Sequence, residues 1–391
     1  MDEVTSAVRA MYELFPYPPA GAPMHRVGTH VRLALSLGQR RPPPGRVLRV
    51  LDAGCGRGIG LLGSATLQPD VLFDGVDLNR VALADLEREV AARGLKNVRT
   101  AEVNLMTMAG LTPPEGGYDG IHSSGVLHHL SDPLQGLQAL KRVLAPHGVM
   151  TVMVYGLFGR EPLYRLVDAI NRVVPDTLSL EERLLAARQM VRQLAMPAVR
   201  TGPWSDLDSL RDAEFVDRYL NVNEVAWSVE ELFDLLDQAG MRFLRWCEPA
   251  DWALPPNSSF SSLPPMVQYQ LVERLQWRHR LEFYATHADN APREALSRDA
   301  LADAVVAVNP EVAFRVESRM LHGHTRTERL LYQLRNQEPV SMTGGLAQAA
   351  GLLQGQNAPF LVHKFCKMLP GVAEPMALVD DLLRREILYV V

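Results

Sequence analysis

The chain has 391 residues, of which 47% are hydrophobic, and a formal net charge of −5 at pH 7. At roughly 150 residues per domain this length predicts about two domains. The mild acidity argues against nucleic acid as a partner, because nucleic-acid binders need a basic surface. Three widely separated cysteines, Cys55, Cys247 and Cys366, predict neither a disulfide framework nor a metal site. The absence of a signal-peptide pattern or an apolar run of ~18 residues favours a cytoplasmic protein with no membrane partner.

Residues 1–46 are predicted to form a short amphipathic helix, an aromatic-proline segment and a Pro/Gly linker. The segment from Tyr12 to Pro19 places Tyr12 and Tyr17 among prolines, which makes it stiff and amphipathic. We expect it to act as a lid over a ligand bound further along the chain. A proline-rich arm packed on the surface is the alternative.

Residues 47–155 alternate strand and helix patterns, as a parallel sheet requires. The predicted strands are Val47 to Leu51, Val71 to Val76, Tyr118 to His122 and Val149 to Tyr155. The last of these is apolar on both faces, which is typical of a central parallel strand. A helix is predicted after Asp132, because Asp132 can cap it and Pro133 suits its first position.

The rest of the chain divides into three regions: a mostly helical insertion at 156–228, a helix–strand region at 229–290, and a mostly helical auxiliary domain at 291–391. In the second region a helix from Val229 should end at Gly240. Strands are predicted there at Met241 to Cys247 and Leu281 to Thr286, and a β-like end at Ile387 to Val391. The expected fold is α/β, with a Rossmann-like, doubly wound, mostly parallel sheet of residues 47–290 that contains the insertion.

The strongest motif is the glycine-rich loop that follows the first predicted strand, from Asp52 to Gly58. Gly54 and Gly56 permit positive φ and let the backbone approach a ligand closely. The helix expected to open near Ile59 offers free N–H groups at its start. Together these features predict a cradle for a polar ligand at the carboxyl edge of the sheet.

The spacing of the loop argues against a dinucleotide and hence against a dehydrogenase. A dinucleotide fold requires G-x-G-x-x-G directly after the strand, and from Gly54 this pattern fails because position 59 is Ile. A literal match from Gly58 to Gly63 begins too late and falls inside the helix. Asp77 ends the next predicted strand, and its carboxylate can accept hydrogen bonds from both hydroxyls of a ribose. The alternative role of Asp77 is to cap the following helix.

Four segments in order resemble the motifs of class I S-adenosylmethionine (SAM)-dependent methyltransferases: Val50 to Gly58, Gly75 to Leu78, Glu102 to Leu105, and Tyr118 to Leu130. The resemblance covers about residues 47–155, with weaker support to 290. It implies SAM as the cofactor, with Asp52 and the loop at its methionine end, Asp77 on the ribose, and Leu78 and Asn104 at the adenine. The implied cofactor-binding residues are Tyr12, Tyr17, Asp52, Gly54, Cys55, Gly56, Asp77, Leu78, Asn104, Leu105, Ser123 and Ser124.

The resemblance also implies an enzyme that transfers a methyl group. A general base is needed only if the acceptor must lose a proton early, as a hydroxyl would. His128 and His129 follow the strand of the fourth motif and titrate near neutral pH, so they are the candidate catalytic residues. The alternative is that one histidine only packs near the cofactor.

The methyl acceptor is left open as a small molecule or a protein, methylated on oxygen or nitrogen, and a homodimer is not excluded. A DNA amino-methyltransferase is disfavoured because Ser123 to Val126 lacks the Asn/Asp-Pro-Pro-Tyr/Phe motif. A non-catalytic SAM-binding regulator and a SAM-dependent enzyme of other chemistry remain alternatives. Residues 221–224, Tyr155-Gly156 and Asp251-Trp252 are expected to border the acceptor pocket. Most of the five tryptophans are expected in the core: Trp204, Trp227, Trp246, Trp252 and Trp277.

Overall fold

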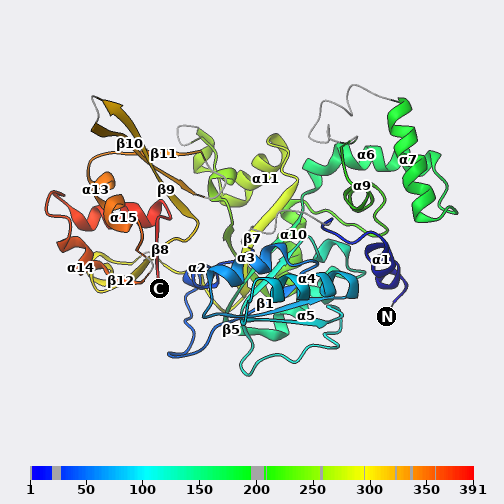
Figure 1. Cartoon of the computed structure of the whole chain (residues 1–391), viewed down its shortest axis with the longest axis horizontal. Helices are drawn as coiled ribbons and strands as arrows, with labels where there is room; N and C mark the ends of the chain where they lie inside the picture. Colours follow the sequence, from blue (N-terminus) through cyan, green and yellow to red (C-terminus); the bar gives the residue numbers. More distant parts are fainter. Residues whose placement is uncertain are drawn as a thin grey trace. The chain divides into compact units, whose positions relative to one another are not determined.

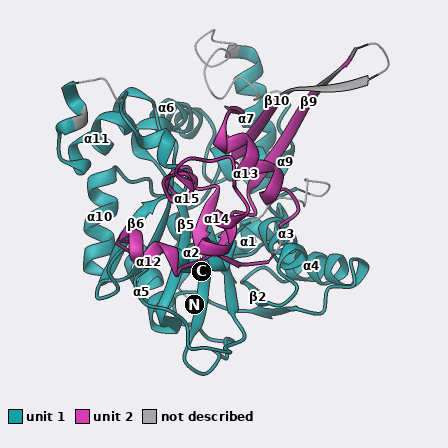
Figure 2. Ribbon diagram, turned by 90° about the vertical axis from the view of Figure 1, so that its left-hand side faces the viewer, with its two compact units in different colours: residues 1–292 teal, residues 293–391 magenta. Residues whose placement is uncertain are grey.

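The computed structural model describes residues 2–19, 28–194, 207, 209–255, 259–294, 296–321, 324–334, 338–356 and 358–391. The chain divides into two compact units, residues 1–292 and 293–391, which Figure 2 shows in different colours. The boundary expected from the sequence, between residues 290 and 291, lies two residues before this division. In the described ranges, no helix is both long enough and apolar enough to cross a membrane.

Unit 1 is built around a seven-stranded sheet with the order β3-β2-β1-β4-β5-β7-β6 (Figure 1). The first five strands in this order pair in parallel, and β7 runs antiparallel to both β5 and β6. The strands are β1 Arg49–Ala53, β2 Leu72–Asp77, β3 Val98–Glu102, β4 Tyr118–Ser124, β5 Leu144–Tyr155, β6 Met241–Trp246 and β7 Arg280–His287. The strand order reverses between β1 and β4, so ligands are expected beyond the carboxyl ends of these two strands. This sheet confirms the predicted Rossmann-like, doubly wound architecture.

Helices cover both faces of the sheet. One face packs against α2 Val31–Leu37, α3 Ile59–Leu67 and α4 Arg80–Ala92, and the other against α5 Pro133–Val143, α10 Val229–Gln238 and α11 Pro265–Leu275. As predicted, Asp132 caps α5 by accepting the Gln135 N–H, with Pro133 in the first helical position. Gly240 follows α10 with a φ of +65°.

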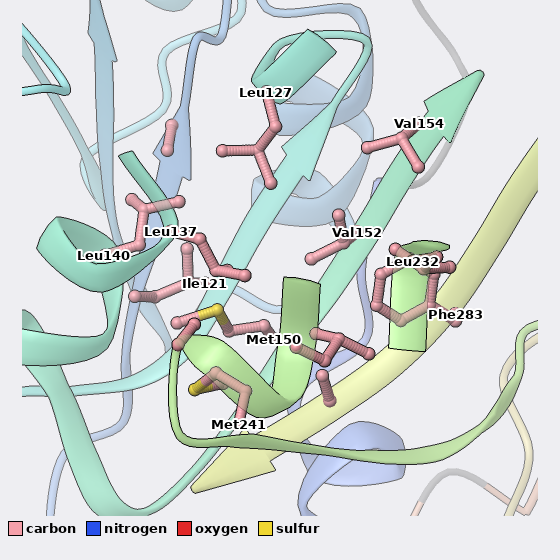
Figure 3. Close-up of a cluster of buried hydrophobic side chains, with 14 of the residues drawn as sticks. Ile121, Leu127, Leu137, Leu140, Met150, Val152, Val154, Leu232, Met241 and Phe283 are labelled. Atoms are coloured by element: carbon pink, nitrogen blue, oxygen red, sulfur yellow. The ribbon is translucent and has the colours of Figure 1, made fainter. Parts of the chain in front are cut away.

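The larger hydrophobic core lies on the α5 and α10 face (Figure 3). Ile121 of β4 lies beside Leu137 and Leu140 of α5, Phe283 of β7 lies beside Leu232 of α10, and all five are buried. Each such side chain stabilises the fold by about 1.5–3 kcal/mol relative to full exposure. This packing holds β4 and β5 rigidly, so the segments that leave their carboxyl ends start from fixed points.

The insertion between β5 and β6 is mostly helical, as expected, and forms a core of its own with the N-terminal helix. Its helices are α6 Leu157–Val173, α7 Leu180–Leu194 and α9 Asp212–Tyr219, and the N-terminal helix is α1 Glu3–Leu14. Met11 of α1 joins Leu163, Ile170 and Phe215 of the insertion in one buried cluster. The N-terminal segment is therefore held against the insertion. Short 3-10 turns complete the unit: η1 Leu127–His129, η2 Pro249–Trp252 and η3 Ser259–Ser262.

Unit 2 has more β structure than the sequence suggested. Besides its helices it contains two three-stranded sheets, with the orders β11-β10-β9 and β12-β8-β13. The helices are α12 Arg298–Ala302, α13 Gly345–Leu353, α14 Val362–Lys367 and α15 Pro375–Arg384. The strands are β8 Val305–Val308, β9 Val312–Leu321, β10 His324–Leu334, β11 Val340–Met342, β12 Phe360–Leu361 and β13 Leu388–Val390. The β9–β10 hairpin was not predicted, although Val312, Phe314 and Val316 alternate with Ala313, Arg315 and Glu317 in the period-2 pattern of a half-buried strand.

Candidate active site

The glycine-rich loop links β1 to α3 at the carboxyl edge of the sheet. Gly54, Gly56 and Gly58 have φ values of +78°, +51° and +75°, in the left-handed region that favours glycine. A Cβ atom on Gly54 would lie 2.4 Å from a methyl carbon of Val126, and one on Gly56 would lie 3.0 Å from the Tyr17 carbonyl oxygen. Glycine is therefore required at both positions by backbone conformation and by close neighbours.

The N–H groups of this loop are already engaged within the protein. Gly54 and Cys55 both donate to the Val76 carbonyl oxygen at 2.8 and 2.9 Å, and the Gly56 N–H donates to Asp77 Oδ2 at 2.7 Å. A phosphate bound here would need free N–H donors. The arrangement therefore disfavours a pyrophosphate and suits a ligand whose nearby end is cationic.

Two carboxylates flank the loop: Asp52 is 6% exposed and Asp77 is partly buried. Burial, and then the charge of Asp77, raises the pKa of Asp52 to about 7. Burial also raises the pKa of Asp77, although backbone N–H groups of Asn79 and Gly56 oppose this. In the described part of the chain no hydrogen bond reaches the Asp52 carboxylate, so a bound cation would relieve its desolvation.

Asp77 does not cap α4, because that position belongs to Asn79. The Asn79 side-chain oxygen accepts the N–H groups of Val81 and Ala82, while its own N–H donates to Asp77 Oδ1 at 2.8 Å. Each Asp77 oxygen therefore accepts one backbone N–H and keeps a lone pair. That fixed orientation fits a carboxylate that accepts the two hydroxyls of a ribose.

The residues expected around the adenine lie beyond the ends of β2 and β3. Leu78, next to Asp77, is partly exposed, and Leu105 is buried. The Asn104 side-chain oxygen accepts the Met106 N–H at 2.9 Å and keeps a second lone pair for an amino group. Cys55 is buried, and burial holds the pKa of its thiol well above the usual value, so it stays protonated.

Ser123 and Ser124 end β4 and lie on opposite sides of it. Ser123 is fully buried and its hydroxyl has no hydrogen-bond partner among the described residues, whereas Ser124 is exposed. Gly125 follows with a φ of +76°. The chain therefore turns sharply at the end of β4 and places η1, with the two candidate histidines, at the carboxyl edge of the sheet.

The aromatic-proline segment lies against the glycine loop. The Tyr17 carbonyl oxygen contacts Gly56, and the Pro18 carbonyl oxygen accepts Arg57 Nη1 at 2.9 Å. Arg57 also pairs with Asp85 of α4 at 2.6 Å. Tyr17 itself is 42% exposed. The segment is thus fastened to the loop by one arginine, and its role as a lid stays a prediction.

His129 is oriented by a hydrogen bond to the backbone. Its Nδ1 lies 2.9 Å from the carbonyl oxygen of Asn223, which can only accept, so the proton sits on Nδ1. No hydrogen bond to Nε2 occurs in the described ranges, and the Nε2 lone pair is left for a proton. The Asn223 amide returns hydrogen bonds to the carbonyls of His129 and Leu130, which fixes the turn.

His128 is placed differently. It is fully buried, its two ring nitrogens have no partner among the described residues, and its ring stacks on Tyr155 with centroids 3.9 Å apart. Burial, and then the neighbouring His129, holds the pKa of His128 well below its usual value. A neutral, buried ring of this kind suits packing rather than proton transfer.

The insertion contributes a further carboxylate beside the histidines. Asp217 of α9 is 7% exposed and accepts the Tyr12 hydroxyl at 2.6 Å. The Tyr12 ring lies edge-on to His129 at 6.0 Å, and its backbone oxygen accepts Asn79 Nδ2 at 2.7 Å. Tyr12 thus connects the end of β2 to Asp217, and no lysine or arginine pairs with that carboxylate in the described chain.

Several of these residues were not singled out from the sequence. Asp217 and Asn79 carry no motif, and only the three-dimensional structure brings them to the site. Of the residues expected to border the acceptor pocket, Tyr155 and 221–224 do lie beside the histidines. The tryptophans lie elsewhere: Trp227, Trp246 and Trp252 are in the core, Trp277 is 54% exposed, and Trp204 is outside the described residues.

Known proteins resemble this chain over different spans. Residues 51–150 match a family described as a methyltransferase domain. An uncharacterized protein of Synechococcus sp. is 29% identical over 293 residues, which covers 70% of this chain and 69% of that protein. Malonyl-[acyl-carrier protein] O-methyltransferase of Halalkalibacterium halodurans is 26% identical over 37% of this chain and 52% of its own length. This chain thus spans about half of that second relative.

A solved structure resembles nearly the whole chain in fold. PKMT2 from Rickettsia typhi, in complex with AdoHcy, aligns over 96% of this chain and 77% of its own with a TM-score of 0.65. Its sequence identity is 17%, so the likeness concerns the fold. It extends beyond the sheet, because an alignment of this length includes the insertion and unit 2.

Proposed function

We propose that this chain, whose residues 51–150 match a methyltransferase domain, is a SAM-dependent methyltransferase that methylates an amine nitrogen held between Asp217 and His129. The observation that carries the choice of acceptor is Asp217, a buried carboxylate without a cationic partner in the described chain. Tyr12 lies between Asp217 and the candidate base, because its hydroxyl donates to Asp217 and its ring packs edge-on to His129. The proposal has three parts: the cofactor side, the acceptor side and the proton.

The cofactor side fits SAM in the chemistry of its groups. Asp52 offers a buried carboxylate to a cationic ligand. Asp77 offers two oxygens, each held by a backbone N–H, to a ribose. The N–H groups of Gly54, Cys55 and Gly56 already donate within the protein and are not available to a phosphate. SAM carries an ammonium, a sulfonium and a ribose, and when bound it supplies an activated methyl group. Positioning of the acceptor can then provide much of the rate.

The acceptor side favours a cation over an anion. Carboxylates as buried as Asp217 are usually paired, because an isolated charge in a low-dielectric interior is expensive. Burial, and then Asp217, raises the pKa values of Tyr12 and Tyr155, so the two hydroxyls stay protonated within range of this carboxylate. An ammonium group would supply the missing positive charge, whereas a carboxylic acid acceptor would be repelled.

His129 is the residue that would take the proton. An ammonium must lose a proton to expose its lone pair, and the candidate acceptor is Nε2 of His129, whose ring centroid lies 6.0 Å from that of Tyr12. Asp217 would orient the ammonium before the proton leaves. His128 would hold the wall of the site through its stack on Tyr155.

The test compares an amine with an alcohol of the same size, and adds a peptide amine. S-adenosylhomocysteine release is measured with butylamine, with a short peptide that has one primary amine, and with 1-butanol. We expect turnover with an amine and none with the alcohol. Asp217→Asn keeps the shape and should reduce amine turnover by about 10–100-fold, since hydrogen bonds to charged groups are worth about 1.5–3 kcal/mol, with SAM affinity unchanged.

A hydroxyl acceptor is the second candidate, supported by Nε2 of His129, which has no hydrogen-bond partner in the described ranges and would suit an oxygen nucleophile equally well. Turnover with 1-butanol and none with either amine would establish it and remove the amine proposal. SAM binding without release of S-adenosylhomocysteine for any acceptor would instead favour a regulatory protein.

A further inference from the structure

We propose that the buried ion pair of Arg160 with Glu224 is a positioning device that sets the orientation and tautomer of His129. The inference rests on the proposed role of His129 as the proton acceptor. Neither Arg160 nor Glu224 reaches the glycine loop, and both belong to the insertion, Arg160 on α6 and Glu224 on the segment 221–227 before α10.

The segment 221–227, which we call the strap, fixes η1 through its backbone. The Val225 N–H donates to the His128 carbonyl, and the Asn223 carbonyl accepts from His129 Nδ1, both at 2.9 Å. The Trp227 N–H donates to the Tyr155 carbonyl at 3.0 Å. The strap therefore ties the end of β5 to both histidines, and the Nδ1 proton of His129 depends on where residue 223 lies.

The ion pair lies at the middle of the strap. Arg160 Nε and Nη2 both donate to Glu224 Oε1, at 3.1 and 2.7 Å, and the Tyr164 hydroxyl donates to the same oxygen at 2.7 Å. The side chains of Arg160 and Glu224 are only 3% and 9% exposed. Oε2 of Glu224 is buried and has no partner in the described residues.

A stack of rings extends this arrangement to the histidines. The guanidinium carbon of Arg160 lies 3.5 Å from the centroid of the Tyr155 ring, and the same ring stacks on His128. The His128 ring in turn meets the edge of His129, with centroids 4.2 Å apart. Arg160 is thus linked to His129 indirectly in two ways. One runs through Glu224 and the strap, and the other through the rings of Tyr155 and His128.

The contribution of the Arg160–Glu224 pair to the stability of the fold does not explain why the pair is there. A buried ion pair often gains less from attraction than it loses in desolvation, and apolar side chains of similar volume can replace it without loss. The pair does, however, impose a fixed geometry, because a planar guanidinium over a ring and two donors on one oxygen leave little freedom. This geometry places the Asn223 carbonyl opposite His129 Nδ1.

The experiment reads the tautomer of His129 directly. In ¹⁵N-histidine-labelled protein without acceptor, NMR should show His129 as the Nδ1–H tautomer, and Glu224→Gln and Arg160→Lys should shift it toward a mixture with Nε2–H. kcat should fall about tenfold or more in both variants, since small misplacements near the chemistry have effects up to about 10². KM for SAM should stay within twofold, and Glu224→Asp, which keeps the charge, should retain more of kcat than Glu224→Gln.

The matched control is Glu273→Gln. Glu273 is equally buried, accepts the Val229 N–H at 2.7 Å and pairs with Arg274, yet none of these residues contacts the histidines. We expect this variant to lose a similar amount of thermal stability with an unchanged His129 spectrum. An unchanged tautomer in Glu224→Gln overturns the inference, whether or not kcat falls. If the tautomer shifts while wild type shows no amine turnover, the positioning role stands and the proposed function fails.

Discussion

The cofactor side and the acceptor side of the site are built in different ways. The cofactor side takes Asp52, Gly54, Gly56 and Asp77 from one strand–loop–helix–strand unit, and backbone N–H groups hold its carboxylate in place. The acceptor side gathers α1, η1, β5 and α9, and side chains of these four segments hold one another. Substitutions on the first side should therefore alter cofactor binding, and those on the second should alter turnover.

The largest effect should separate the two histidines on the acceptor side. His129→Ala removes the Nε2 lone pair and should lower kcat by about 10²-fold or more, within the range for lost general bases. His128→Phe keeps the stack on Tyr155 and should stay within about tenfold of wild type, because both ring nitrogens lack partners. Steady-state kinetics decides the matter: equal losses in the two variants would contradict the distinct roles.

On the cofactor side, Asp77→Ala should weaken SAM binding by about 10²-fold, because hydrogen bonds to charged groups are worth about 1.5–3 kcal/mol. Isothermal calorimetry gives the affinity. Asp74→Asn is the control, since Asp74 lies on the same strand but accepts the Tyr118 hydroxyl instead. Equal affinities for wild type and Asp77→Ala would show that the ribose is held elsewhere.

The loop backbone should tolerate a methyl group poorly. Gly54→Ala places a Cβ at positive φ against Val126 and should destabilise the fold by about 1–3 kcal/mol. Gly94 has a similar φ of +65° but nothing within 4 Å of a built Cβ, so Gly94→Ala should lose only about 1 kcal/mol. Chemical denaturation of the two variants measures the difference, and equal losses would mean that contact with Val126 is unimportant.

The smallest effect is the pH dependence of SAM affinity. Asp52 has a pKa near 7 in the unliganded chain, so a cationic ligand must displace its proton below that pH. Affinity should be constant above pH 8 and about tenfold weaker at pH 6. The same raised pKa favours the protonated folded chain, so its contribution to stability should decline as pH rises from about 4 to 7. Calorimetry on Asp52→Asn should show a flatter profile, and an equally steep one would exclude Asp52.

The sequence alone predicted six of the seven strands of the large sheet, all but β3, and the residues proposed for the cofactor side. Strands β1, β2, β4 and β5 are short apolar runs, and Asp52, Gly54 and Asp77 stand at their ends, where parallel strands must bring them to one edge. The hairpin strands of unit 2 were not predicted, although the apolar residues Val312, Phe314 and Val316 stand at alternate positions of β9. Local sequence patterns thus predict the strands and loops whose structure depends on residues close together in the sequence.

Only the tertiary structure decided the acceptor side. Tyr12 meets Asp217 across 205 positions of sequence, and Arg160 meets Glu224 across 64. Such contacts depend on how α1 and the insertion share a core, and single side chains carry no periodic signal of their distant partners. Asp217 therefore reads as an ordinary helical residue in the sequence, and becomes a candidate binding group only once burial and the tyrosine hydroxyls around it are known.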